Sequence, residues 1–167
     1  NRQQDHLSRN PSGQMPTLEL DNGEFISEIT VICDYLDEQH GYTDLIGKTP
    51  EDRAETRMWT RRIDLQIVEP LTNGFRFSEG HDFFKDRLRL IPQAADDLKT
   101  LAQERITWLD GQIEGKEFIC GDRFSLADIM LYCFLNFGTT VGQPLNEDNK
   151  NVVNLYNKIH TRPSASA

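Results

Sequence analysis

The sequence predicts a mostly α-helical protein, with a small α/β unit at the N-terminal end and an all-α helical bundle after it. Two short strand-like runs flank an Asn-Gly pair near the start of the chain, and a Gly- and Thr-rich segment follows the first helical pattern. From Glu51 onward no convincing strand pattern occurs, so the remainder is expected to be helical. We therefore divide the chain into residues 1–41, a linker at 42–50 and a bundle at 51–167.

The N-terminal unit is expected to be a β-hairpin followed by a helix. The run TLEL at 17–20 alternates in polarity and predicts a strand, and EFI predicts the return strand. The Asn-Gly pair between them accepts the positive φ of a tight hairpin turn. Ser27 and Glu28 then begin a helix that ends near Gly41. An isolated two-stranded ribbon is marginal in water. Either the hairpin packs on the bundle or residues outside this sequence complete its sheet, and we favour the second.

The bundle is expected to consist of helices with apolar stripes. Their predicted ranges are 51–77 with a kink or end at Pro70, 81–89, a helix from Pro92 through Ile113, 125–137, and 152–160. Ser125 and Asp128 form a capping box at the start of the fourth helix. We interpret this pair as a stabilising cap and not as a catalytic pair, because no motif brings a histidine to it.

Composition excludes several classes of function. The chain has 18 Lys and Arg against 27 Asp and Glu, a net charge of −9, so neither nucleic acid nor an anionic membrane is an expected partner. No apolar run reaches the roughly 20 residues of a membrane span, and no signal peptide is visible. Three widely spaced cysteines, Cys33, Cys120 and Cys133, form no metal or disulfide pattern and are expected in the core. A reducing, cytoplasmic location fits this usage, and no metal site is predicted.

Two segments carry a resemblance to a known family. NPSGQMPTLELDNGEFISEITVICDYLDE, at 10–38, resembles the second half of the thioredoxin-like domain of the cytosolic glutathione S-transferase superfamily. GDRFSLADIMLYCFLNF, at 121–137, resembles the capping-box helix of the all-α C-terminal domain of that family. The resemblance implies an incomplete thioredoxin-like domain over 1–41 and the all-α domain over 51–167, in agreement with the division above.

The resemblance also implies a glutathione site. Met15 and Pro16 match the family's cis-proline pair, in which the residue before the proline offers its main chain to the cysteinyl part of glutathione. Glu28 and Ile29 match the pair that holds the γ-glutamyl end, and Ile29 lacks the hydroxyl common at that position. Gln14 matches a position that reaches the glycyl carboxylate. The residues alone leave a purely structural interpretation open for each position. Pro16 can be an ordinary trans proline at the start of a strand, Ser27 and Glu28 can cap the helix, and Gln14 can be a solvated turn residue.

No catalytic residue is assigned to this chain. The family's first β-α-β unit, with the Tyr, Ser or Cys that acts on the glutathione sulfur, has no counterpart here and is expected upstream. Acceptor-pocket candidates on the first bundle helix are Arg57, Trp59, Arg62 and Gln66, although such residues more often belong to the core or to the solvated surface.

The resemblance implies an enzyme that transfers the thiolate of glutathione, its cosubstrate, to a hydrophobic electrophilic small molecule, and that forms a homodimer. The alternative is a non-catalytic binding or scaffold module of the same fold. The absent hydroxyl at Ile29 favours this alternative mildly.

Overall fold

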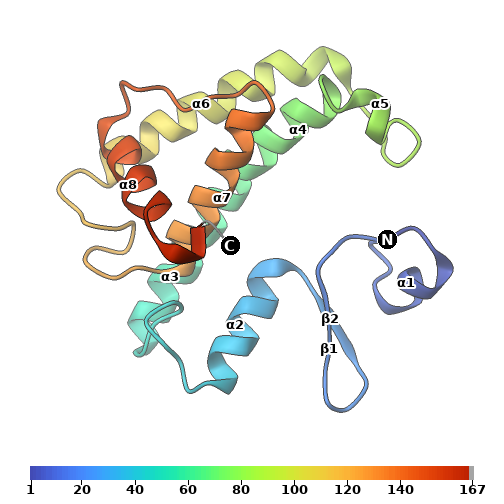
Figure 1. The fold of residues 1–167 in the computed structure, drawn as a ribbon, viewed down its shortest axis with the longest axis horizontal. Coiled ribbons are helices and arrows are strands. Elements are labelled where there is room, and N and C mark those ends of the chain that lie inside the picture. Colours follow the sequence, from blue (N-terminus) through green and yellow to red (C-terminus); the bar gives the residue numbers. More distant parts are fainter. Residues whose placement is uncertain (166–167) are drawn as a thin grey trace.

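In the computed structural model, which describes residues 1–165, a two-stranded hairpin and its flanking helices precede a bundle of helices (Figure 1). This arrangement confirms the predicted fold class. The elements are α1 (Gln4–Arg9), β1 (Thr17–Glu19), β2 (Phe25–Ser27), α2 (Ile29–Gln39), α3 (Pro50–Ile63), a π-helix (Asp64–Val68), α4 (Glu69–Phe77), α5 (His81–Phe84), α6 (Ala95–Gln112), α7 (Leu126–Thr140) and α8 (Lys150–His160), with 3-10 turns at Pro92–Ala94 and Pro163–Ala165. The predicted division into three segments stays a prediction.

The hairpin forms where the Asn-Gly pair predicted it. β1 and β2 are antiparallel, and the register pairs Thr17 with Ser27. Gly23, with a φ of 81°, donates its N–H to the carbonyl of Leu20 at 2.8 Å and closes the turn. Glycine adopts this left-handed backbone without steric cost. β2 extends to Ser27, so α2 begins at Ile29, slightly later than the sequence pattern suggested.

Two short helices differ from the prediction. α1 was not predicted, because none of its residues is buried and its polar sequence has no apolar period. An ion pair between Asp5 and Arg9, at 3.1 Å, supports it at the favourable spacing of four residues. α5 ends at Phe84, well before the predicted Arg89, since it has no buried face that would extend it.

Pro70 changes the hydrogen bonding of the long helix without ending its path. α3 gives way to the π-helix at Asp64, and α4 continues from Glu69 to Phe77. Proline lacks an N–H, and its ring clashes with a carbonyl one turn earlier. The wider π-helical turn immediately before Pro70 accommodates both defects.

The core lies between α3, the π-helix, α6, α7 and α8. α7 packs against α3 and α8, and α6 packs against α4 and α8. Met58, on α3, lies outside this core and is 40% exposed. None of the helices in residues 1–165 combines the length and the apolar character needed to cross a membrane. The buried core residues include Trp59, Ile63, Ile67, Ile106, Leu109, Ile119, Leu131, Leu135, Val152 and Leu155.

The capping box predicted at the start of α7 is present and fully buried. Asp128 accepts from both the N–H and the hydroxyl of Ser125 at 2.8 Å, and from the N–H of Ile119 at 2.9 Å. Burial raises the pKa of the Asp128 carboxyl, and these hydrogen bonds offset part of that rise. The carboxylate therefore joins the loop before α7 to the helix itself.

Arg123 ties the segment between α2 and α3, and the first turn of α3, to the loop just before α7. Its guanidinium donates to the carbonyl of Asp44 at 2.8 Å and to that of Asp52 at 3.1 Å. Nearby, the N–H of Leu126 donates to the carbonyl of Leu45 at 2.9 Å. These bonds fix the path by which the chain passes from the hairpin unit to the bundle.

We expect Asp128→Ala to lower the free energy of unfolding by about 3 kcal/mol, because two buried peptide N–H groups lose their acceptor. Urea denaturation followed by circular dichroism measures this value. Asp122→Ala, which removes an exposed carboxylate in the same loop, is the matched control and is expected to be nearly neutral. An Asp128→Ala protein as stable as the control contradicts the structural role given to this cap.

Candidate ligand-binding site

The hairpin register brings the two predicted site segments, 14–16 and 28–29, to the same end of the sheet. Because Thr17 pairs with Ser27, the chain enters β1 through one segment and leaves β2 through the other at the hairpin's open end. The Met15–Pro16 peptide is cis, as the resemblance implied. Residues that are far apart along the chain thus flank one surface.

Met15 presents free main-chain groups on that surface. Its side chain is 72% exposed, and within residues 1–165 neither its peptide N–H nor its carbonyl has a hydrogen-bond partner. A peptide group of this kind can pair with an extended ligand as one more strand. Gln14, also exposed, lies directly beside it.

Asn10 holds the segment that carries these groups. It is 2% exposed, and its side-chain amide donates to the carbonyl of Gln14 at 3.0 Å and to the hydroxyl of Thr17 at 3.2 Å. Its side-chain oxygen accepts from the N–H and the hydroxyl of Ser12. A ring nitrogen of His6, which must carry a proton to donate, lies 2.9 Å from the same Gln14 carbonyl.

The role of Asn10 was not predicted, because the pair Asn10-Pro11 is locally typical of a turn. Gly13, just before Gln14, has a φ of 64° that glycine adopts readily. The sequence around Asn10 is therefore typical of a turn. The hydrogen bonds from the Asn10 amide to Gln14 and Thr17 can be identified only in the folded structure.

Glu28 and Ile29 form the other side of the surface. Glu28 has a φ of 73°, a conformation that costs a non-glycine residue about 1–3 kcal/mol and that clusters at functional sites. Its exposed carboxylate does not cap α2. The amides in the first turn of α2 have no intrahelical acceptor, and they carry the partial positive charge of the helix N-terminus. The junction therefore offers an acceptor for a cation and donors for a carboxylate.

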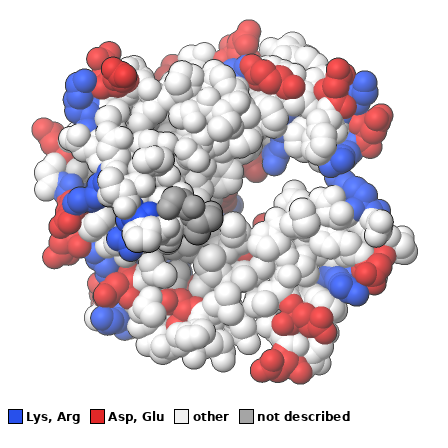
Figure 2. All heavy atoms as spheres, in the orientation of Figure 1, with Lys and Arg blue, Asp and Glu red and all other residues white. Residues whose placement is uncertain are grey.

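A cleft of about 480 Å³ extends from Gln14 and Met15 toward α4 and α5. We call it the Met15 cleft. The molecular surface is hollowed between the N-terminal segment and these two helices, and basic side chains lie along the hollow (Figure 2). Its lining residues include Arg2, Asn73, Arg76, Phe77, Phe84, Arg87 and Arg89.

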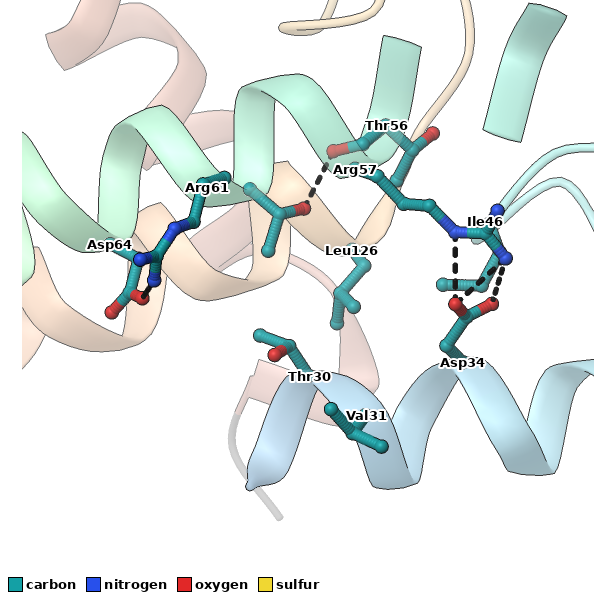
Figure 3. A pocket seen from close by; sticks show the side chains of 10 residues that line it. Thr30, Val31, Asp34, Ile46, Thr56, Arg57, Arg61, Asp64 and Leu126 are labelled. Carbon is teal, nitrogen blue, oxygen red and sulfur yellow. Dashed lines mark hydrogen bonds and ion pairs between the residues drawn. The ribbon is translucent and has the colours of Figure 1, made fainter. Parts of the chain in front are cut away.

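A second cleft, of about 220 Å³, lies between α2 and α3 (Figure 3). Arg57 spans it and donates to both carboxylate oxygens of Asp34, at 2.9 and 3.1 Å. Thr30 and Val31, from the first turn of α2, line its floor. The ion pair holds α2 against the bundle and so fixes the direction in which the helix N-terminus points.

The acceptor-pocket candidates proposed from sequence do not line the Met15 cleft. Arg57 is engaged with Asp34, and Trp59 is a core residue, 4% exposed, that packs against Trp108. Arg62 lies over the Trp59 ring at 5.0 Å, and Gln66 is half-buried in the π-helix. The residues of α4 and α5 that do line the cleft carried no motif, so only the packing of these helices identifies them.

None of the three cysteines has the environment of a nucleophile. Burial raises the pKa of Cys33, Cys120 and Cys133, which favours the thiol over the reactive thiolate. Cys120 is buried as expected, and Cys33 is half-buried. The expectation of a core position was wrong for Cys133, which lies on the exposed side of α7.

Comparison with known proteins identifies the family. A family model described as the glutathione S-transferase N-terminal domain matches residues 1–39, and one described as the glutathione S-transferase C-terminal domain matches residues 89–163. The chain belongs to the glutathione S-transferase superfamily. The two matched ranges correspond to the hairpin unit and to the later helices of the bundle.

Several individual proteins are also similar to this chain. Glutathione S-transferase 2 of Saccharomyces cerevisiae is 28% identical over 158 residues, covering 95% of this chain and 68% of that protein. A crystal structure of Gtt2 from Saccharomyces cerevisiae superposes with a TM-score of 0.91 at 27% identity, over 99% of this chain and 79% of that one. Human elongation factor 1-gamma is 28% identical over 135 residues, 81% of this chain and 29% of that protein. The chain also spans about half the length of two tobacco relatives named as probable glutathione S-transferases (49% each).

We expect Asn10→Ala to loosen residues 10–17, because the Gln14 carbonyl and the Thr17 hydroxyl lose their shared donor. Hydrogen–deuterium exchange should show amide exchange in this segment at least about tenfold faster. Asn154→Ala, at an exposed position of α8, is the control and should leave the segment unchanged. Equal exchange in both variants contradicts the assigned role.

Proposed function

We propose that the protein is a glutathione transferase that binds glutathione across the open end of the hairpin. The observation that carries this proposal is the meeting of the unpaired Met15 main chain with the uncapped start of α2 and the Glu28 carboxylate. Glutathione is an extended tripeptide with an ammonium and a carboxylate at one end, a thiol in the middle and a carboxylate at the other end. Each of the three features can pair with a part of this tripeptide: the Met15 main chain with its middle, and the start of α2 and Glu28 with the end that carries both an ammonium and a carboxylate.

In this proposal Met15 pairs with the cysteinyl main chain, so that the thiol is held at a fixed position along the surface. Glu28 accepts from the γ-glutamyl ammonium, and the N–H of Ile29 donates to the γ-glutamyl carboxylate. Gln14 reaches the glycyl carboxylate. The exposed Ile29 side chain offers no hydroxyl, so its amide acts without that additional donor.

The chemistry follows from placing a thiolate at this surface. A donor hydrogen bond to the sulfur stabilises the charged form, lowers the thiol pKa and supplies the nucleophile at neutral pH. None of the residues assigned to the site donates to that sulfur. The proposal therefore assigns this sulfur-directed role to none of the residues named here.

We further propose that the transferase acts in the cytoplasm as a homodimer. The exposed apolar side chains of Ile29 and Val31 on α2 and of Met58 on α3 support an interface on this side of the molecule. Such side chains favour burial against a second copy. The acceptor is a small electrophilic molecule that enters from the Met15 cleft.

A second candidate is a binding module without catalysis. The similarity to elongation factor 1-gamma, a protein not named as a transferase, and the absence of a hydroxyl at Ile29 support it. Calorimetric titration of the intact protein with glutathione, followed by assay with 1-chloro-2,4-dinitrobenzene, separates the two. Binding with turnover supports the enzyme, and binding without turnover supports the module.

We expect Glu28→Gln to weaken glutathione binding about tenfold in calorimetry, because the ammonium loses a charged acceptor. N-acetylglutathione, which has no ammonium, should bind the variant and the parent equally. Glu19→Gln, an exposed position on β1, is the matched control and should leave both affinities unchanged.

Two outcomes contradict the proposal. One is a Glu28→Gln protein that binds glutathione as the parent does. The other is absence of binding by the intact parent protein at millimolar glutathione.

A further inference from the structure

Four arginines line the Met15 cleft. Arg2 approaches from the N-terminal segment, Arg76 from α4, and Arg87 and Arg89 from the segment after α5. The guanidinium of Arg2 donates to the carbonyl of Arg87 at 3.4 Å, so the two rims of the cleft meet at this point. Arg76 is oriented by Asn73, whose side-chain oxygen accepts its N–H at 3.0 Å.

None of these arginines is neutralised. Within residues 1–165 no carboxylate forms an ion pair with Arg2, Arg76, Arg87 or Arg89, and no acidic residue lines the cleft. The chain as a whole carries a net charge of −9, whereas this cleft gathers four arginines and no acidic residue. Like charges around a concave surface repel each other, and a bound anion relieves that repulsion.

Aromatic rings form the rest of the wall. Phe77 and Phe84 are half-buried in the cleft, and the guanidinium of Arg76 lies 5.8 Å from the centre of the Phe84 ring. A flat apolar body can pack against these rings while an acidic substituent reaches the guanidinium groups. The cleft therefore suits a molecule with both properties.

We infer that the acceptor substrate of this protein is an anionic electrophile, an aromatic or unsaturated compound that carries a carboxylate. The inference rests on the proposed transferase function and adds the class of acceptor. The carboxylate binds Arg76 and Arg89, and the apolar body lies between these arginines and the thiol of glutathione. This differs from the purely hydrophobic acceptor that the sequence resemblance implied.

A matched pair of probes tests the inference on the intact protein. 4-Chloro-3,5-dinitrobenzoate and 4-chloro-3,5-dinitrobenzamide share the leaving group and both nitro groups, and they differ in charge. With either probe the glutathione thiolate attacks the ring carbon that bears chlorine. A C–S bond forms, the C–Cl bond breaks, chloride leaves with the electron pair, and the thiol proton passes to solvent.

We expect kcat/KM for the benzoate to exceed that for the benzamide, each corrected for its uncatalysed rate, by about tenfold at low ionic strength. The excess should shrink as salt screens the cleft. The double variant Arg76→Gln and Arg89→Gln should lose most of the excess, measured as the ratio of kcat/KM for the benzoate to that for the benzamide. Arg105→Gln, which removes one exposed charge on α6, is the control and should keep the excess.

A readout that needs no turnover accompanies the assay. The glutathione conjugates of the two probes, made chemically, are titrated by calorimetry, and the anionic conjugate should bind the parent about tenfold more tightly. Equal binding of the two conjugates overturns the inference and leaves the proposed function standing. Absence of binding by both conjugates overturns the proposed function and the inference with it.

Discussion

The antiparallel pairing of Thr17 with Ser27 is the constraint on which the candidate site depends. This register fixes which residues leave the sheet together at its open end. A shift of one residue would turn each side chain to the other face and would separate the Met15 peptide from the start of α2. The turn at Gly23 sets the register of the two strands. The hydrogen bond from the Asn10 amide to the Gln14 carbonyl then fixes the segment that leads into β1.

The bundle provides the fixed surface against which this hairpin is placed. Arg57 and Asp34 link α3 to α2 across a partly exposed cleft, so their ion pair contributes orientation more than free energy. Arg123 and Asp128 act from buried or half-buried positions and fix the connecting segment to α7. The candidate site thus lies at the exposed end of a small sheet. Contacts with the much larger helical bundle set the orientation of α2, which forms one side of the site.

Local patterns in the sequence were sufficient for the main elements. The Asn-Gly turn, the alternation in TLEL and the Ser125–Asp128 box act within a few residues, and each produced the expected structure. Features that depend on packing were missed. The π-helix before Pro70 is one case, since the sequence shows the proline but not how the backbone accommodates it.

The candidate site likewise combines features that the sequence predicted and features that depend on packing. The resemblance assigned residues 14–16 and 28–29 as binding residues, which remains a proposal, and the register explains how they meet. The positive φ of Glu28 and the bonds of Asn10 could not be predicted, because they depend on contacts between separate segments. The arginines that line the Met15 cleft come from the N-terminal segment, from α4 and from the segment after α5, and no local pattern encodes how these parts meet.

The central claim is that one glutathione molecule contacts both segments at the open end of the hairpin. Titration of the ¹⁵N-labelled intact protein with glutathione, followed by amide resonances, tests it most directly. We expect the amide signals of Met15 and Ile29 to shift together and to report one dissociation constant. Shifts confined to a different surface, or movement of only one of the two amides, would contradict it.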